Sequence, residues 1–268
     1  MKVVFSRKGF DSASGGIPNP ILPDGTLLSL PIPSPGDDIP YGALSYGGMT
    51  YYDIIHSLSP RNRIQPSSTC HLDPDLRRDV IPRVNWQPAF GQIGSSLIHL
   101  YNQGVGIGDL FLFFGWHRQT EIQDGRLRFV PGAPDLHIIY GYLQVGAIIK
   151  SKEGLPNSLL RHPHAADFRW QTNRNALFLP TETLSLVPSL PGYACLDYAP
   201  KRVLTKPGCK RRIWELPPFF KDIPISYNRK AWREEGFVSA GRGQEFVFEP
   251  NEEALNWVKE IIQKRLPG

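Results

Sequence analysis

The sequence predicts an α+β fold, in which a mixed, mostly antiparallel sheet or partly closed β-barrel packs against a few helices. The 268 residues include 26 Pro and 25 Gly, spread evenly, which favours short strands and ordered loops over long helices. The run Leu110–Phe114 is apolar without alternation, as in a strand buried on both faces. An amphipathic pattern from Pro250 to about Arg265 adds a terminal helix. Because no flexible linker interrupts the chain, we expect one domain over residues 1–268.

The amino-terminal third is predicted to consist of short strands joined by loops. Val3–Phe5 is a short apolar strand, and Thr26–Leu30 is a second one that prolines end. The segment Tyr51–Leu58 forms a helix or a strand. Residues 60–90 are expected to be irregular, because four prolines interrupt every periodic pattern there. A loop region this long inside a compact domain is usually functional.

The rest of the chain shows both helical and strand patterns. Apolar residues at three- and four-residue spacings predict a helix over Gln92–Gln103. Asp124-Gly125 is a hairpin signal between the strands His117–Gln123 and Arg126–Val130. Further strands are expected at His137–Lys150, Ala176–Leu179, Gly236–Val238 and Glu245–Glu249.

The glycine-rich loop that follows the first strand is the first candidate functional site. Glycines let the backbone approach a ligand closely, and loops on a rigid strand often carry binding residues. The loop matches neither the Walker phosphate motif nor the GxGxxG dinucleotide motif. We expect Asp11 and Asp24 to be catalytic, with Asp11 as the better placed general base. The alternative is an ordinary surface loop. The expected ligand contacts in the loop are Lys8, Ser12, Ser14, Gly15 and Gly16.

A basic segment from Lys201 to Arg233 is the second candidate. It holds ten Lys and Arg against Glu215 and Asp222, a net charge of +8 in a chain whose total is +5. Such clustering is typical of a protein with a polyanionic partner. The interleaved aromatic residues either stack on unpaired bases or belong to the core, with the cations as a solvated rim. The cations expected to bind nucleic acid are Lys201, Arg202, Lys206, Lys210, Arg211 and Arg212.

Two other stretches are candidate ligand contacts. Trp116 and His117 follow the apolar strand directly, which is a usual position for residues that line a ligand site. Arg242 is flanked by glycines, so its guanidinium could bind phosphate while Gln244 hydrogen-bonds a base edge. The alternative for this second stretch is a plain turn that enters the strand at Glu245.

The histidines and cysteines do not form a familiar metal or thiol motif. His162 and His164, with Asp167 nearby, could begin a metal site, but no third ligand is signalled, so we expect no metal. Cys70, His71 and Asp73 could supply a thiolate and a base. If this segment is a strand, however, the side chains of Cys70 and His71 point to opposite faces, which disfavours a nucleophile–base pair.

Three cysteines make a disulfide framework unexpected, and the sequence shows neither a signal peptide nor a membrane-spanning run. We therefore expect a cytoplasmic protein with no membrane partner. No motif identifies a cofactor.

Several of these stretches occur together in one known family. The segments RKGFDSASGG, PNPILPDG and SLPIP, then FGQIG and GDLFLFFGW, and finally AGRGQEFV, resemble a prokaryotic and phage family called nucleotide modification associated domain, third type. The matching segments run from residue 1 to about 250. The resemblance implies a role in DNA base modification, inferred for the family from gene neighbourhood, and it implies no particular reaction.

A second likeness concerns residues 106–149, which are similar to small barrels of the PUA and EVE type that hold RNA or a modified base. Three functions are compatible with these observations. The first is a base- or nucleotide-modifying protein whose partner is a nucleotide or nucleic acid, DNA more than RNA. The second is a non-enzymatic reader with a PUA-like barrel that holds a modified base between aromatic residues such as Trp116 and Tyr140. The third is a defence or scaffold protein that only docks on DNA through the basic segment.

Overall fold

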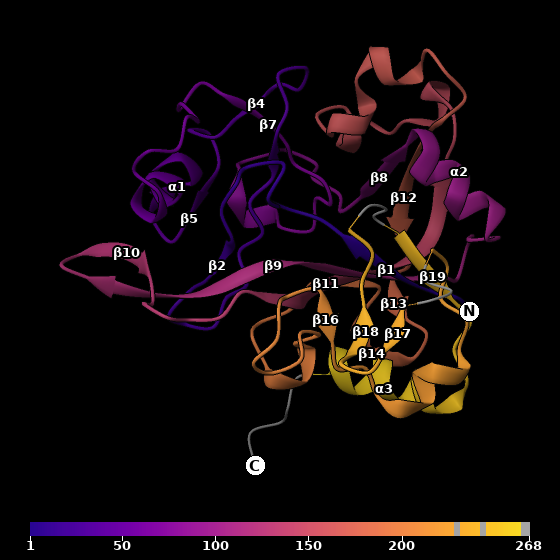
Figure 1. Cartoon of the computed structure of the whole chain (residues 1–268). Helices are drawn as coiled ribbons and strands as arrows, with labels where there is room; N and C mark the ends of the chain where they lie inside the picture. Colours follow the sequence, from indigo (N-terminus) through magenta and orange to yellow (C-terminus); the bar gives the residue numbers. More distant parts are fainter. Residues whose placement is uncertain (228–230, 242–244, 264–268) are drawn as a thin grey trace.

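A mixed sheet forms the centre of the computed structural model, which describes residues 1–227, 231–241 and 245–263. Its main path runs in the order β19-β1-β9-β11-β12-β8, and its other three strands are attached beside β9 and β11 (Figure 1). The strand β1 lies parallel to β9, whereas the other neighbours along this path are antiparallel. This arrangement, with the three α-helices of the described residues packed around it, confirms the predicted α+β class. The bounds along the path are Glu245–Phe248 for β19, Val3–Arg7 for β1, Leu110–Gln123 for β9, Leu136–Ile149 for β11, Asn175–Pro180 for β12 and Phe90–Ile93 for β8.

The long strand β9 connects the sheet to the amino-terminal loops. The sequence indicates two strands here, but the structure has one continuous strand of 14 residues. Its far end forms a hairpin with β10 (Arg126–Phe129), and both turn residues have positive φ, 51° at Asp124 and 73° at Gly125, as the Asp-Gly signal predicts. The strand β2 (Asn19–Ile21) runs parallel to His117–Gln119 and so brings the glycine-rich loop beside β9.

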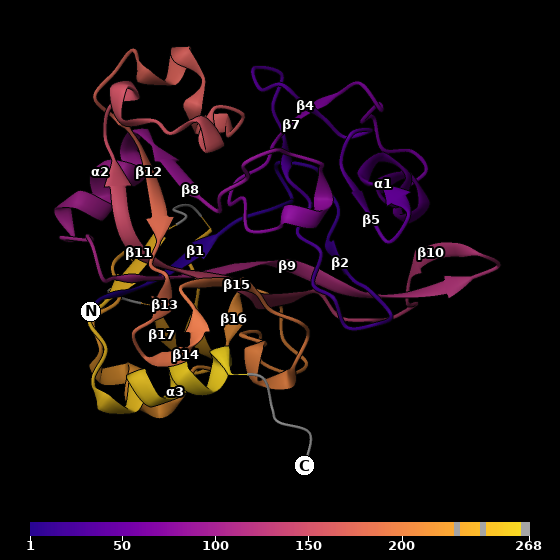
Figure 2. The ribbon, with the colours of Figure 1, turned by 180° about the vertical axis from the view of Figure 1, so that it is seen from behind.

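Both faces of the sheet are buried, which explains the absence of alternation in Leu110–Phe114. The side chains of Leu110, Leu112 and Phe114 face a core that also contains Trp214 and the helix α3 (Glu252–Ile262). The side chains of Phe111 and Phe113 face a second core, with the helix α2 (Gly94–Asn102). The helices α2 and α3 therefore lie on opposite sides of the sheet (Figure 2).

The helices begin at side-chain caps or beside strands. The helix α1 (Tyr51–Leu58) begins at Thr50, whose side chain forms a capping box with Asp53. The Asn251 side chain accepts the Ala254 N–H and starts α3 just after the predicted proline. None of the helices in the described ranges has the length and apolar character that a membrane crossing requires.

The prediction of a strand over Thr26–Leu30 is wrong. Only Thr26 and Leu27 form isolated bridges, while Leu28 and Leu30 pack into a third core around α1. Their backbone N–H groups instead bond to residues of β2. The Leu28 N–H donates to the Pro20 carbonyl at 3.2 Å, and the Leu30 N–H donates to Asn19 Oδ1 at 2.7 Å. The remaining short strands are β3 (Ile32–Pro33), β4 (Ile39–Pro40), β5 (Ser45–Tyr46), β6 (Met49–Thr50), β7 (Thr69–His71), β13 (Thr183–Leu184), β14 (Val187–Pro191), β15 (Tyr193–Cys195), β16 (Ile213–Trp214), β17 (Trp232–Arg233) and β18 (Gly236–Val238).

Candidate functional site

A cavity of about 900 Å³ lies between the glycine-rich loop and the basic segment, and we call it the basic cavity. One wall is formed by Asp11 and Ser12 of the loop and by Trp116 of β9. The opposite wall carries four of the six cations expected to bind nucleic acid, Lys206, Lys210, Arg211 and Arg212. Two segments that are about 200 residues apart in the sequence thus share one cavity.

Arg211 connects the two walls of the basic cavity. Its guanidinium carbon lies 4.1 Å from the centre of the Trp116 ring, which is a cation–π contact. Its Nη2 atom donates a hydrogen bond to the Ser12 hydroxyl of the glycine-rich loop. The guanidinium is therefore held in place beside an aromatic face, in the geometry that suits binding of a phosphate or a planar ring.

The glycine-rich loop is shaped by Asp11. Its Oδ1 atom accepts the N–H groups of Ala13 and Ser14, both at 2.8 Å, so the carboxylate fixes the turn. Gly15 has a φ of +88°, and a Cβ atom there would lie 2.2 Å from the Phe10 ring. The loop is thus a packed turn, and it presents the half-buried Asp11 to the cavity wall.

The basic segment divides into two parts with different roles. Lys201 and Arg202 donate to the backbone carbonyls of Glu260, Ile261 and Gln263, at the end of α3. These two cations cap a helix, where its last carbonyls are electronegative. The four cations from Lys206 onward line the basic cavity instead. Of the interleaved aromatic residues, Trp214 and Phe220 are fully buried, as the core alternative expects.

Two histidines near Trp116 are buried and neutral. His117 is fully buried, and burial lowers its pKa to about 3. It does not line the basic cavity, whereas His137 on the neighbouring strand does. The Nδ1 atom of His137 accepts the Trp214 Nε1–H at 3.0 Å, and burial, with Arg7 and Arg211 nearby, lowers its pKa to about 3 as well. Sequence reasoning missed His137, although it pairs directly with Trp116 in the ladder between β9 and β11.

A second cavity of about 290 Å³ adjoins the first, and we call it the histidine cavity. Its lining includes His71, Asp73 and His164, together with Lys8. Arg7 and Asp11 line both cavities, so these two residues form the boundary between them. His71 ends β7, Asp73 follows two residues later, and His164 lies in the one-turn 3-10 helix Pro163–Ala165.

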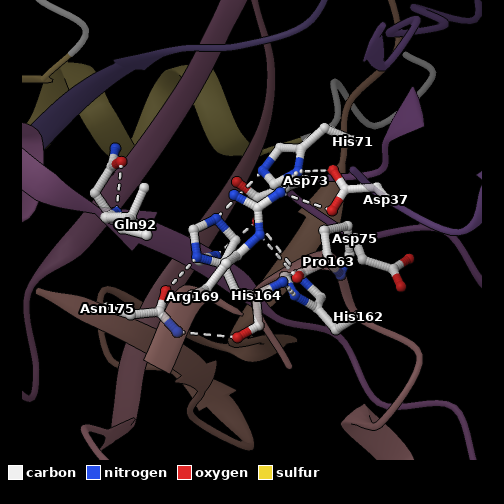
Figure 3. Close-up of polar contacts among 12 residues, drawn as sticks. Asp37, His71, Asp73, Asp75, Gln92, His162, Pro163, His164, Arg169 and Asn175 are labelled. Atoms are coloured by element: carbon white, nitrogen blue, oxygen red, sulfur yellow. Dashed lines mark hydrogen bonds and ion pairs between the residues drawn. The ribbon is translucent and has the colours of Figure 1, made fainter. Parts of the chain in front are cut away.

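The His71 side chain is held by an ion-paired carboxylate, as Figure 3 shows. Its Nδ1 atom lies 2.7 Å from Asp37 Oδ2, and Arg169 Nη2 donates to Asp37 Oδ1 at 2.6 Å. Burial alone would raise the pKa of Asp37, but the hydrogen bonds from His71 and Arg169 outweigh it and lower that pKa strongly. Asp37 is therefore an ionised acceptor. The Arg169 Nε atom also donates to the Pro163 carbonyl at 3.0 Å, which ties Asp37 to the segment that carries His164.

The His164 side chain is held by an amide. Its Nδ1 atom lies 2.7 Å from Asn175 Oδ1, and Asn175 Nδ2 donates back to the His164 carbonyl at 3.0 Å. The second bond fixes the orientation of the amide, so Oδ1 must be the acceptor. Burial lowers the pKa of His164 to about 3. Its Nε2 atom lies 3.2 Å from the Nε2 atom of His71.

Asp73 completes the group of three. Its Oδ1 atom accepts the Gly91 N–H at 2.6 Å and lies 3.4 Å from His162 Nε2. Burial would raise the pKa of Asp73, but His162, His164 and Lys8 outweigh it and lower that pKa strongly. The ligand atoms of His71, Asp73 and His164 all lie within 4.8 Å of one another.

Lys8 is buried and paired. Its Nζ atom lies 3.3 Å from Glu245 Oε1, and the two side chains are 9% and 1% exposed. The same ammonium group lies 4.6 Å from the centre of the Phe90 ring. Glu245 also accepts a hydrogen bond from Gln92 Nε2. Lys8 thus carries a positive charge at the wall of the histidine cavity, and the basic cavity is lined by other cations.

The structure does not bring every predicted residue to these cavities. Asp24 is exposed, accepts the Thr26 N–H at 2.9 Å, and lines neither cavity, so its carboxylate stabilises a turn. Ser14 lines the histidine cavity, while Gly15 and Gly16 line a separate shallow groove. Arg242 and Gln244 lie outside the described residues. Their neighbour Gly241 lines the basic cavity.

Trp116 and Tyr140 do not share a cavity. Trp116 lies two residues after Phe114 and so points to the same face of β9 as that side chain, while Tyr140 packs with Phe113 in the core on the other face. A base stacked between these two particular rings, the example given for the reader hypothesis, does not fit this sheet.

The histidine cavity combines residues from two short stretches that the sequence analysis treated separately. Each stretch has histidine and acidic residues close together in the sequence. The group that forms takes His71 and Asp73 from one stretch and His164 from the other. Asp167 pairs with Lys152 at 2.6 Å and is exposed. The sequence signals for this group are the irregular region 60–90, the His162–His164 pair and the stretch from Cys70 to Asp73, but no local pattern connects the two stretches.

The comparisons with known proteins give one family. A model of the family described as nucleotide modification associated domain 3 matches residues 2–249. No curated protein and no solved structure matches the chain.

Proposed function

The chain belongs to the nucleotide modification associated domain 3 family, and from this premise we propose that it binds a nucleotide of a nucleic acid in the basic cavity and modifies it there. The observation that carries the proposal is the position of Arg211, which lines that cavity and is held there by contacts with Trp116 and Ser12.

The size and charge of the basic cavity support a nucleotide ligand. About 900 Å³ lies within the range of small-molecule sites, which is roughly 300–1,000 Å³. Lys206, Lys210 and Arg212 add three cations around Arg211, which suits a phosphodiester. Trp116 offers an aromatic face for a base, although Arg211 already contacts its ring, so the base would stack beside or in place of the guanidinium.

Asp11 is the proposed general base. It lines both cavities and is held rigidly through the two hydrogen bonds that its Oδ1 atom accepts. A positioned carboxylate within reach of a substrate hydroxyl or amine is the minimum requirement for proton abstraction. An Asn side chain would keep the same acceptor oxygen, so Asp11→Asn removes the charge while leaving the loop intact.

Binding is tested by fluorescence anisotropy with short single-stranded DNA and RNA oligonucleotides. We expect Arg211→Ala to weaken binding about tenfold and to reduce the salt slope by about one. The control is Arg126→Ala, an exposed cation on β10 outside the basic cavity, which should change neither value. Equal effects of the two substitutions would contradict the proposed binding site.

Modification is tested by mass spectrometry of nucleosides from cells that express the protein. We expect a modified nucleoside with the native sequence and none with Asp11→Asn, while the affinity for oligonucleotides stays unchanged. A protein that prefers a modified oligonucleotide but produces no new nucleoside would be a reader, and this result would overturn the enzymatic part of the proposal.

A further inference from the structure

The side chains of His71, Asp73 and His164 form a metal-ligand set. We propose that they bind a divalent first-row transition ion, such as Zn²⁺, Fe²⁺ or Co²⁺, with open coordination positions that face the histidine cavity. The ion site is inferred from side-chain geometry alone. Only its relation to a substrate rests on the proposed function.

The hydrogen bonds of the two imidazoles determine which nitrogen is available. Asp37 accepts the proton on His71 Nδ1, and Asn175 Oδ1 accepts the proton on His164 Nδ1. Arg169 Nη2 lies 3.4 Å from the same nitrogen of His71, but its 2.6 Å bond goes to Asp37. In each neutral ring the Nε2 atom then carries a lone pair.

The two Nε2 lone pairs lie close together. The Nε2 atoms are 3.2 Å apart, and two lone pairs at that distance repel each other unless a cation or a shared proton lies between them. Two nitrogen ligands about 2.1 Å from one ion, at angles of roughly 90–110°, are about 3.0–3.4 Å apart. The observed separation matches two ligands of a single ion.

The residues that accept hydrogen bonds from the two imidazole rings are of the types that orient metal-binding histidines. Metal-bound histidines nearly always donate the other ring N–H to a carboxylate or carbonyl group, which fixes the tautomer and the orientation. Here Asp37 and Asn175 supply such acceptors, one for each ring. Asp73 Oδ1 is occupied by the Gly91 N–H, which leaves Oδ2 as the oxygen available to a cation.

The ligand set indicates the class of ion and its coordination. Two imidazoles and one carboxylate favour borderline transition metals, whereas Ca²⁺ and Mg²⁺ prefer oxygen ligands. Three protein ligands leave at least one position open, as in catalytic rather than structural sites. Because Arg7 and Asp11 line both cavities, this open side lies next to the basic cavity, where a nucleotide is proposed to bind.

The test uses full-length protein without a histidine tag, stripped with chelator and titrated with Co²⁺. We expect one ion per chain, detected by calorimetry and by visible d–d absorption bands. His71→Gln and His164→Gln should abolish the bands, and Asp37→Asn should weaken binding about 10- to 100-fold. The control His56→Gln, on α1 and outside the ligand set, should bind like the native protein.

A native protein that binds no Co²⁺, or that binds it equally well after His71→Gln, overturns the proposal, because a proton shared between the rings would then explain their contact. If the buried His164 variant fails to fold by circular dichroism, His71→Gln decides the question, since that side chain is 15% exposed. Metal binding is read without oligonucleotide, so its failure is distinguishable from a failure of the proposed function.

Discussion

Removal of the Lys8 ammonium group is expected to destabilise the protein strongly. Lys8→Met leaves the Glu245 carboxylate in a site that is 1% exposed, with the hydrogen bond from Gln92 and the electrostatic attraction of Arg7. Breaking a buried ion pair on one side costs about 3–5 kcal/mol, because the other charge stays buried and unpaired. This loss is a large part of the roughly 5–15 kcal/mol by which a domain is stable.

Burial, rather than distance, should determine this cost. The Lys152–Asp167 pair is shorter, 2.6 Å against 3.3 Å, but its side chains are 50% and 84% exposed. We therefore expect Lys152→Met to cost about 0–1 kcal/mol. The double variant Lys8→Met with Glu245→Gln should recover at least half of the stability lost in Lys8→Met, since no buried charge remains.

The assay is urea unfolding followed by circular dichroism for the native protein and these three variants. The reasoning is refuted if Lys8→Met costs no more than Lys152→Met, or if the double variant is as unstable as Lys8→Met alone.

Three further outcomes follow from burial, backbone conformation and cavity lining. Folding lowers the pKa of His117 from 6.5 to about 3. Below pH 6.5 the unfolded protein therefore binds a proton at His117 that the folded protein does not bind, and the free energy of unfolding falls by about 1.4 kcal/mol per pH unit. His117→Gln should reduce the pH dependence of urea-derived stability between pH 7 and pH 4 without abolishing it, because burial also lowers the pKa values of His137 and His164, and an unchanged slope would contradict this. Gly15→Ala should cost about 1–3 kcal/mol more than Gly16→Ala in calorimetry, because both have positive φ but only Gly15 would press a Cβ into Phe10. The half-buried Cys209 lines the basic cavity, so a bound oligonucleotide should slow its reaction with a thiol reagent, and an equal rate would argue against binding there.

The sheet was predictable because its signals are local. The unbroken apolar run Leu110–Phe114, the Asp124-Gly125 turn and the helical spacing before Gly104 each report the environment of a few neighbouring residues. Thr26–Leu30 has the same kind of apolar composition, but it packs as an irregular segment, in which the Leu30 N–H donates to the Asn19 side chain and not to a partner strand.

The candidate site was only partly predictable, because its contacts are between distant segments. The glycine-rich loop and the cations from Lys206 to Arg212 could be identified by composition, and the structure brings them together. Composition could not distinguish Arg202, which caps a helix, from Arg211, which lines the cavity. The approach of His71 to His164, 93 residues later, depends on Asp37 and Arg169, which no local pattern connects.

The hydrogen bonds from Lys201 and Arg202 to the last carbonyl groups of α3 have a practical consequence for shortened versions of the protein. The family match ends at residue 249, before this helix begins. A chain trimmed to that boundary would lose the anchor of the segment that continues to Arg211, and it would lack Val258 and Ile261, so the apolar residues that pack against these two side chains would be uncovered. Such a fragment would lack part of the core on one face of the sheet, so shortened proteins are poor material for judging what the intact one does.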